Sequence, residues 1–264
     1  MSDAPSQGKL HYVKDGPVAR ITFDNPSAFN ALNERMWADM DAAAKDVAQD
    51  RDIRVVTFRG VGGKAFVSGT DISDFANFRT GADGLAYERK VSAFMVSLDH
   101  IPQTTIAIVD GWAVGGGINI CSACDFRIAT PSAKFGSPLG RTIGNCLSTS
   151  SYARVMAAVG MQIAKRMILL GELIPAQQLL ESGFLYSIVE PSELDAAAEA
   201  LVQRAAENAP ITTKATKEAI RRAVFGAMPN IDDLIEEVYA SDDFRAGVAN
   251  FLAKNKSIVK WQGR

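Results

Sequence analysis

Residues 104–135 read TTIAIVDGWAVGGGINICSACDFRIATPSAKF. The run Thr104–Val109 is rich in Thr, Ile and Val, a composition typical of a strand that is covered on both faces. A glycine-rich turn follows, then a short helix that opens at residues 115–117, and then a second strand over Phe126–Ala129. This order of elements predicts a layered α/β core.

The glycine triplet at 115–117 is a candidate ligand-binding feature. Glycine permits a sharp turn and lets a ligand come close to bare backbone amides. Amides in the first turn of a helix have no intrahelical acceptor and lie at the positive end of the dipole, so they suit an anion or an oxyanion. Taken alone, the triplet is better explained as a tight structural turn, because it matches no specific fingerprint.

The segments before residue 104 extend the alternation of strands and helices. Residues 10–14 and 18–24 flank Asp15-Gly16-Pro17 and predict a β-hairpin. Asn33 precedes an apolar helical pattern and is expected to cap it. The further elements expected here are a helix over 33–47, a strand over 55–58, a loop over 60–69, a short helix from 71, a loop over 77–84 and a helix over 85–100.

Beyond residue 131 the pattern becomes helical. It predicts one late strand, over 185–189, among otherwise helical segments. The last third is therefore expected to be an α-rich cap without a second core of its own. The helices are expected over 152–159, 163–170, 176–182, 192–208, 212–225, 231–240 and 242–254.

Composition narrows the class of protein. Of 264 residues 47% are hydrophobic and 22% charged, with a net charge of −2, and the basic residues are scattered. This balance predicts a globular protein and argues against a nucleic-acid partner. No apolar run approaches the ~18–20 residues of a membrane span, and the first ten residues lack a secretory signal, so no membrane partner is expected.

The three cysteines are expected to be small buried thiols. Cys121 and Cys124 have redox-motif spacing, and Cys146 lies apart from them. They lack the four-ligand set of a zinc site, so no metal is expected. Unpaired thiols are typical of a reducing compartment, which predicts a cytoplasmic location.

Five collinear segments carry a resemblance that spans about the whole chain. They are NPSAFNALN (25–33), AFVSGTDISDF (65–75), IAIVDGWAVGGGINICSACDFRIA (106–129), GELIPAQQLLESGFLYSIVEP (171–191) and FLAKNKSIVKW (251–261). In this order they resemble the crotonase, or enoyl-CoA hydratase/isomerase, family. The resemblance implies an α/β fold: a crotonase-like ββα spiral core over residues 1–190, with an α-helical C-terminal region over 191–264 that serves assembly into a homotrimer or a dimer of trimers.

The resemblance also implies an acyl-CoA thioester as substrate, with coenzyme A as part of that substrate and no separate cofactor. The backbone amides of Thr70 and Gly116 would hold the thioester oxygen. Lys260 could approach the phosphates, from a neighbouring subunit. The residues expected along or near the adenine and pantetheine are Ala28, Phe29, Ser68, Asp71 and Ile72.

The chemistry of a thioester agrees with this assignment. Removing a proton from the α-carbon, or adding to the β-carbon, places negative charge on the thioester oxygen. Two fixed N–H donors in a dry site stabilise that charge, and losing one donor typically costs ~3–4 kcal/mol. Backbone donors need only room for close approach, which Gly69 and the triplet provide.

Two positions depart from the family pattern. Asn119 and Leu139 stand where the hydratases of the family carry the two glutamates that hold and deprotonate water. Neither side chain can act as a base. Asn119 either orients a water or a substrate carbonyl by hydrogen bonds, or only packs beside the ligand. Leu139 is expected to be pocket wall.

Other polar groups are candidates around the acyl pocket. Arg141 either binds a carboxylate on the acyl group or points outward. Asn145 could steer the substrate, and Cys146 would need an activating base to act as a nucleophile. By resemblance, Asp74, Asp83 and Glu88 are acidic candidates from the stretch that covers the acyl pocket in relatives, although exposure at the surface is favoured for each. His11 and His100 are expected to be structural or exposed, and Ser148 stands in place of the aspartate of the dehalogenase branch.

Three hypotheses about function follow. The first is an enzyme of the enoyl-CoA hydratase/isomerase type, in which Thr70 and Gly116 stabilise an enolate and the base is unassigned. The second is a divergent reaction on a functionalised acyl-CoA, such as C–C cleavage or isomerisation. The third is a non-catalytic acyl-CoA-binding protein that kept the fold.

Overall fold

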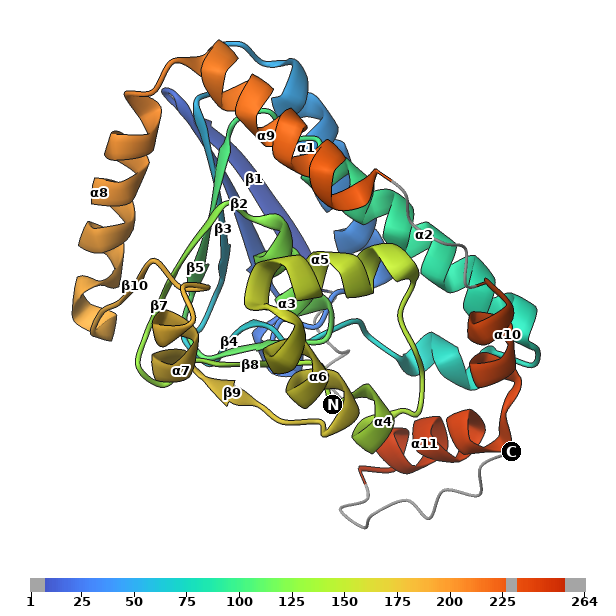
Figure 1. Cartoon of the computed structure of the whole chain (residues 1–264). Helices are drawn as coiled ribbons and strands as arrows, with labels where there is room; N and C mark the ends of the chain where they lie inside the picture. The colour runs from blue at the N-terminus through green and yellow to red at the C-terminus, as the bar shows by residue number, and fades with distance from the viewer. Residues whose placement is uncertain (1–7, 227–231, 255–264) are drawn as a thin grey trace, which may run out of the picture.

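The structure is a computed structural model that describes residues 8–226 and 232–254. Two sheets form its centre (Figure 1). The six-stranded sheet has the order β1 (Lys9–Asp15), β2 (Val18–Asp24), β3 (Val55–Gly60), β5 (Thr104–Val109), β7 (Phe126–Ala129) and β10 (Ser187–Ile188). The four-stranded sheet has the order β4 (Ala65–Val67), β6 (Trp112–Val114), β8 (Lys134–Gly136) and β9 (Ile174–Pro175).

The chain passes from the six-stranded sheet to the four-stranded sheet three times. β3 leads into β4, β5 into β6 and β7 into β8, and within each sheet these strands pair in parallel. Helices follow all three passes: α2 (Gly81–Asp99) after β4, α3 (Gly116–Ala123) after β6 and α4 (Leu139–Thr142) after β8. This repeated order of two strands and a helix is the ββα spiral that the resemblance predicts.

The expectation for β5 as a doubly covered strand is confirmed. All of its residues are buried. Ala107 and Val109 belong to one hydrophobic cluster, and Ile106 and Ile108 belong to a second cluster on the opposite face. Successive residues of a strand point to opposite faces, so both faces of this strand need an apolar cover.

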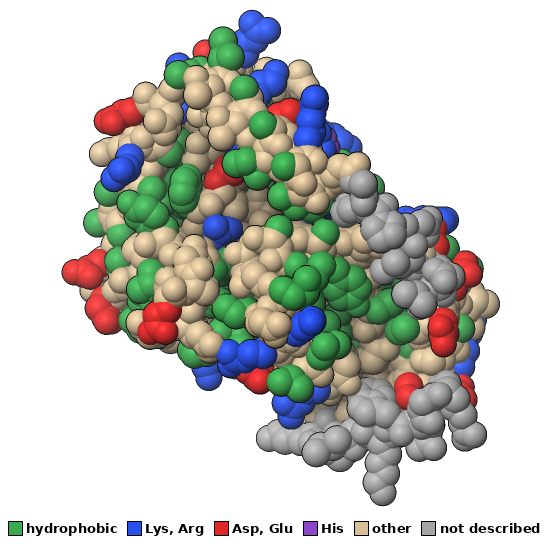
Figure 2. All heavy atoms as spheres, in the orientation of Figure 1, with side chains coloured by type: hydrophobic (Ala, Val, Ile, Leu, Met, Phe, Trp, Pro, Cys, Tyr) green, Lys and Arg blue, Asp and Glu red, His purple; other side chains and the backbone are tan. Residues whose placement is uncertain are grey.

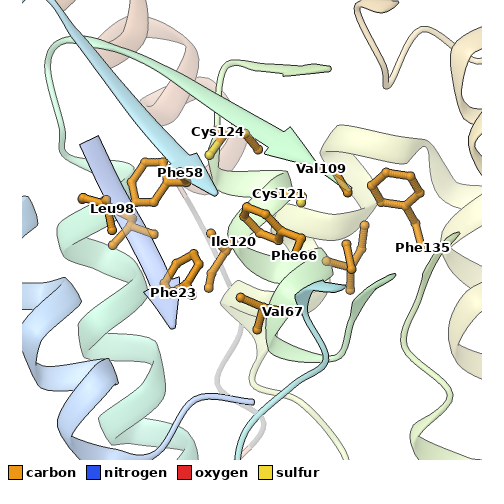
Figure 3. Close-up of a cluster of buried hydrophobic side chains, with 14 of the residues drawn as sticks. Phe23, Phe58, Phe66, Val67, Leu98, Val109, Ile120, Cys121, Cys124 and Phe135 are labelled. Atoms are coloured by element: carbon orange, nitrogen blue, oxygen red, sulfur yellow. The ribbon is translucent and has the colours of Figure 1, made fainter. Parts of the chain in front are cut away.

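Helices provide that cover from two sides (Figure 1). α1 (Glu34–Gln49) and the C-terminal half of α2 contribute Met36, Met40 and Leu98 to the larger cluster. α8 (Leu194–Ala206) contributes Leu201 and Val202 to the second cluster. Figure 3 shows the larger cluster, where Phe23 and Phe66 meet edge to face with ring centroids 5.6 Å apart.

The hairpin, α1 and its Asn33 cap are confirmed. Asn33 lies in extended backbone, and its side chain accepts a hydrogen bond from the Met36 amide. Two expectations are wrong, and the first concerns the short strands. The loop expected over 60–69 contains β4, and β6, β8 and β9 were not expected, because strands of two or three residues show no periodicity.

The start of α2 is the second correction. Residues 77–84 were expected to form a loop, but the helix begins at Gly81. Thr80 and Asp83 form a capping box at this end. Gly81 and Gly84 suggested a loop in the sequence, whereas in the structure they allow close contact with another helix, as described below.

The remaining helices are α5 (Thr149–Val159), α6 (Met161–Leu169), α7 (Ala176–Glu181), α9 (Pro210–Phe225), α10 (Asp232–Ala240) and α11 (Asp242–Leu252), with 3-10 turns η1 (Pro26–Ala28), η2 (Ser73–Asn77) and η3 (Pro191–Glu193). α10 packs on α2, and α11 packs on η2 and α4. Ile235, Tyr239 and Phe244 of these two helices form a third cluster with Phe75 and Leu85. The C-terminal region therefore closes over the core of its own chain.

Candidate functional site

A cavity of about 140 Å³ lies where the loops after β4 and β6 meet α2, α4 and the start of α5. Residues from all four quarters of the chain line it. They are Trp37, Ser68, Gly69, Thr70, Ile72, Phe75, Tyr87, Glu88, Val91, Val114, Gly115, Gly116, Asn119, Pro138, Leu139, Thr142, Ile143, Asn145, Leu147, Ser151 and Phe251. We call this cavity the Thr70–Gly116 cavity.

The turn at Thr70 is fixed from both sides. The Leu32 amide donates to the Gly69 carbonyl at 2.9 Å, and the Asp71 amide donates to the Leu32 carbonyl at 2.8 Å. These bonds make a parallel bridge between Leu32 and Thr70. Within the described part of the chain, the N–H of Thr70 donates no hydrogen bond.

Gly116 is the first residue of α3, where an amide has no intrahelical acceptor. Its N–H likewise donates no hydrogen bond to any described residue. A Cβ placed on Gly116 would lie 3.6 Å from the carbonyl carbon of Gly69, so the two turns are in contact. Gly115 has φ +56°, a conformation that favours glycine, and its amide donates to the Gly136 carbonyl at 3.0 Å. Two residues from separate turns thus line one cavity, and the backbone N–H of each has no acceptor among the described residues.

The side chain of Thr70 is also held in place. Its Oγ1 accepts hydrogen bonds from the Tyr87 hydroxyl at 2.9 Å and from the Trp37 Nε1 at 3.3 Å. Both donors come from helices, α2 and α1. The side chain is thus oriented by two aromatic residues, and the backbone N–H takes no part in this arrangement.

Glu88 was expected to lie on the surface, and this expectation is wrong. Its side chain is 3% exposed and lines the Thr70–Gly116 cavity. The Ser148 amide donates to Oε2 at 2.9 Å, and the Tyr239 hydroxyl donates to Oε1 at 2.9 Å. Burial raises the pKa of Glu88 to about 7, although these two hydrogen bonds act in the opposite direction.

Asn119 is buried and has partners at both ends of its amide. Its Nδ2 donates to Ser151 Oγ at 2.9 Å, and its Oδ1 accepts from Arg154 at 3.0 Å. Arg154 is also buried and forms an ion pair with Asp99. Asn119 thus lines the cavity as one member of a buried polar network.

Other candidates lie in or beside the cavity. Ser68 and Ile72 line it, and Leu139 forms part of its wall. Asn145 also lines it, and its buried Oδ1 has no hydrogen-bond partner among the described residues, while its Nδ2 donates to the Tyr239 hydroxyl at 3.3 Å.

Several candidates lie outside the described lining of the cavity. Ala28 accepts a hydrogen bond at its carbonyl from the Ser68 hydroxyl, and Phe29 is exposed and stacks on Trp112. Asp71 is exposed and accepts from the Ser73 amide. Arg141 is exposed, and its side chain lies beside Gly171, outside the cavity lining. Lys260 lies outside the described residues.

The thiol and imidazole groups do not provide a nucleophile–base pair at the cavity. Burial raises the pKa of Cys146 to about 12, so its thiol stays protonated near pH 7. His11 bonds to Asp24 on the first hairpin, and His100 caps the C-terminal end of α2. Within the described ranges, no group of three or more His, Cys, Asp or Glu residues could hold a metal ion.

A larger cavity, of about 800 Å³, lies between α9 and the body of the molecule. Figure 2 shows a hollow in this face with acidic and basic side chains within it. Several of its charged groups form ion pairs, since Asp99 bonds to Arg154 and Asp125 bonds to Lys217 at 2.6 Å. It contains neither Thr70 nor Gly116, so the smaller cavity is the better candidate for chemistry.

The sequence over residues 14–264 matches the family model for enoyl-CoA hydratase/isomerase. The chain belongs to the enoyl-CoA hydratase/isomerase family. Short-chain-enoyl-CoA hydratase from Clostridium acetobutylicum is 32% identical over 250 residues, which cover 92% of this chain and 94% of that protein. (E)-benzylidenesuccinyl-CoA hydratase from Thauera aromatica is 33% identical over 202 residues, which cover 76% and 78%.

Solved structures support the same membership. An enoyl-CoA hydratase/carnithine racemase from Magnetospirillum magneticum is similar with a TM-score of 0.78 at 30% identity, over 95% of both chains. A methylmalonyl-CoA decarboxylase in complex with 2-nitronate-propionyl-CoA is similar with a TM-score of 0.86 at 25% identity, over 97% of this chain and 98% of that one. Membership identifies the protein as an enzyme with the crotonase fold. No helix in the described ranges has the length and apolar character that crossing a membrane requires.

Proposed function

We propose that the protein binds an acyl-CoA thioester in the Thr70–Gly116 cavity and stabilises its enolate. The amides of Thr70 and Gly116 donate to the thioester oxygen as negative charge develops there. A single observation carries this proposal: Thr70 and Gly116 line one cavity and come from turns in contact, and neither backbone N–H donates to a described residue. Fixed donors of this kind need no reorganisation during the reaction.

The reaction class that follows is proton transfer at the α-carbon, as in isomerisation or hydration of a 2-enoyl-CoA. The names of relatives favour this class, since they include hydratases that act on enoyl-CoA thioesters. Asn119 and Leu139 occupy the positions at which the resemblance places the two hydratase glutamates. Hydration by two carboxylates is therefore not available at these positions, and any base must come from another element.

A second candidate is decarboxylation of a 2-carboxyacyl-CoA, which also passes through an enolate. The similarity to the methylmalonyl-CoA decarboxylase favours it. The described lining of the cavity holds no Lys or Arg to bind the substrate carboxylate before it leaves as CO2, which makes proton transfer the better supported of the two. The third hypothesis, binding without catalysis, is an outcome of the test below.

Butyryl-CoA in D2O tests the proposal, because a stabilised enolate exchanges its α-protons whatever the natural acyl group is. Mass spectrometry of butyryl-CoA after incubation should show uptake of deuterium at the α-carbon. Loss of the conjugated thioester absorbance of crotonyl-CoA would then identify hydration, and release of CO2 from methylmalonyl-CoA would identify decarboxylation. Tight binding of butyryl-CoA with no exchange at high enzyme concentration would contradict enolate formation.

A further inference from the structure

Glu88 stands apart from the other groups of the Thr70–Gly116 cavity. It is the only carboxyl group among the described residues that line it. The remaining polar side chains there are hydroxyls, amides and the Trp37 indole, which neither gain nor lose a proton near pH 7. Glu88 is therefore the described group in this cavity that can accept a proton from a ligand, or donate one to it, near pH 7.

Two routes through the structure connect Glu88 to the two amides. On one side Glu88 comes directly after Tyr87 in the sequence, and the Tyr87 hydroxyl donates a hydrogen bond to the Thr70 side chain. On the other side the Ser148 amide bonds to Glu88, and Ser148 caps α5 by accepting from the Ser151 amide. Ser151 then bonds to Asn119, one turn after Gly116 in α3. The carboxyl group and both donors thus surround the same space.

Two hydrogen bonds orient the carboxyl group, and its oxygens can accept more. Oε1 accepts from Tyr239 and Oε2 accepts from Ser148, each at 2.9 Å. A carboxylate has about four lone-pair sites, so each oxygen keeps one for a proton from a ligand. Two fixed donors also orient the group, as a base needs when it must meet one carbon atom.

We propose that Glu88 is the group that removes a proton from the α-carbon of the acyl-CoA and returns one to the acyl chain. This assignment rests on the proposed function. In the forward step the Cα–H bond breaks, its electron pair moves into the thioester carbonyl to give the enolate, and the proton goes to a Glu88 oxygen. In the return step the O–H bond breaks, a new C–H bond forms from the enolate electron pair, and the carboxylate is restored.

The surroundings of Glu88 suit this role. The titratable groups around Glu88 come from α2, α10, α5 and the loop before α5. They are Tyr87, Tyr239, Tyr152 and Cys146. Burial raises the pKa of each of them, so all four are neutral at pH 7. A base with a pKa near the working pH is present in its ionised form yet still accepts a proton readily.

The test measures deuterium exchange into butyryl-CoA by the wild-type protein, Glu88→Gln and Glu88→Asp. Glu88→Gln keeps the shape and an acceptor but has no useful basicity, so exchange should fall at least ~100-fold. Glu88→Asp should recover part of the rate. The dissociation constant of butyryl-CoA should change by less than ~3-fold in both variants, because the thioester donors are untouched. Glu237→Gln, an exposed change on α10, is the matched control and should exchange at the wild-type rate.

Tyr239→Phe provides a readout that a merely structural role would not move. Removing a donor to the carboxylate disfavours its ionised form, so the pH at which exchange reaches half its maximum should shift upward. If the wild-type protein exchanges and Glu88→Gln exchanges at a rate within ~3-fold of it, the assignment to Glu88 is overturned while the proposed function stands. No exchange by a wild-type protein that binds butyryl-CoA would overturn both.

Discussion

The Tyr239 hydroxyl donates a hydrogen bond of 2.9 Å to Glu88, although the two residues are 151 positions apart in the chain. Glycines on α2 make this approach possible. A Cβ on Gly84 would lie 1.9 Å from the Tyr239 ring, and one on Gly81 would lie 2.1 Å from the Glu236 carbonyl oxygen. α10 therefore rests directly on the backbone of α2, one turn before Glu88.

Gly84→Ala should destabilise the protein in spite of its better helix propensity. Alanine in a helix is favoured over glycine by roughly 0.5–1 kcal/mol, but the new methyl group overlaps Tyr239 and forces α10 to move. We expect a net loss of about 1–3 kcal/mol, as overpacking typically costs. Urea unfolding measures it.

Gly140→Ala is the matched control, because a Cβ there meets no atom within 4 Å. Because Gly140 lies in α4, the change should leave the free energy of unfolding unchanged or raise it by up to about 1 kcal/mol. Equal stability of both alanine variants would contradict the close packing of α10 on α2.

Glu88→Gln should alter how stability depends on pH. Burial raises the pKa of Glu88 from 4.5 to about 7, so between these values the folded protein binds more protons than the unfolded chain. The stability that Glu88 contributes in its protonated form is therefore lost as pH rises from about 4.5 to 7. A shift of this size corresponds to about 3 kcal/mol. Relative to the wild type, Glu88→Gln should gain up to that amount between pH 5 and pH 8, as measured by urea unfolding at each pH.

Gly116→Pro should remove one donor of the proposed pair. Gly116 is the first residue of α3, where proline is tolerated because its missing N–H has no helical acceptor. Loss of one such donor typically costs ~3–4 kcal/mol of transition-state stabilisation, so exchange into butyryl-CoA should fall by about 100- to 1000-fold. The far-ultraviolet circular dichroism spectrum should remain that of the wild type.

Gly116→Ala separates the donor from the space around it. Alanine keeps the N–H, while its Cβ would lie 3.2 Å from the Trp37 ring. Exchange should fall much less than in Gly116→Pro. Equal losses in the two variants would mean that crowding against Trp37, and not the missing donor, causes the defect.

Asn119→Ala distinguishes the two readings of this residue. Within the buried network it would leave Ser151 and Arg154 each short of one partner, which costs about 1–3 kcal/mol of stability. If Asn119 only supports the fold, the rate of exchange at saturating butyryl-CoA should change little. We expect this result, because both ends of the amide are already bonded within the protein. A large fall in that rate with unchanged stability would instead indicate contact with the substrate.

Much of the fold could be predicted from local patterns. β5 is apolar throughout and buried on both faces, and Asn33 precedes a helical repeat and caps it. The four-stranded sheet could not be predicted in this way. β4 and β6 have three residues each, and they exist because they pair with each other after folding. Strands of this length carry no periodic signal.

The candidate site likewise has one part that the sequence could predict and one part that it could not. Thr70 and Gly116 could be proposed from sequence because the segments around them resemble the two loops of the family that hold the thioester oxygen, and the neighbouring glycines leave room for close approach. The burial of Glu88 depends on α10, which comes from the far end of the chain. The available signal was Gly81 and Gly84, seven and four residues before Glu88, which place two glycines on the same helical face as the carboxyl group.

The most direct measurement of the central claim is a crystal structure with butyryl-CoA bound. We expect the thioester oxygen to lie about 2.7–3.1 Å from the backbone nitrogens of both Thr70 and Gly116, with the α-carbon facing Glu88. A thioester oxygen bound anywhere else, with either amide bonded to another acceptor, would contradict enolate stabilisation by these two residues.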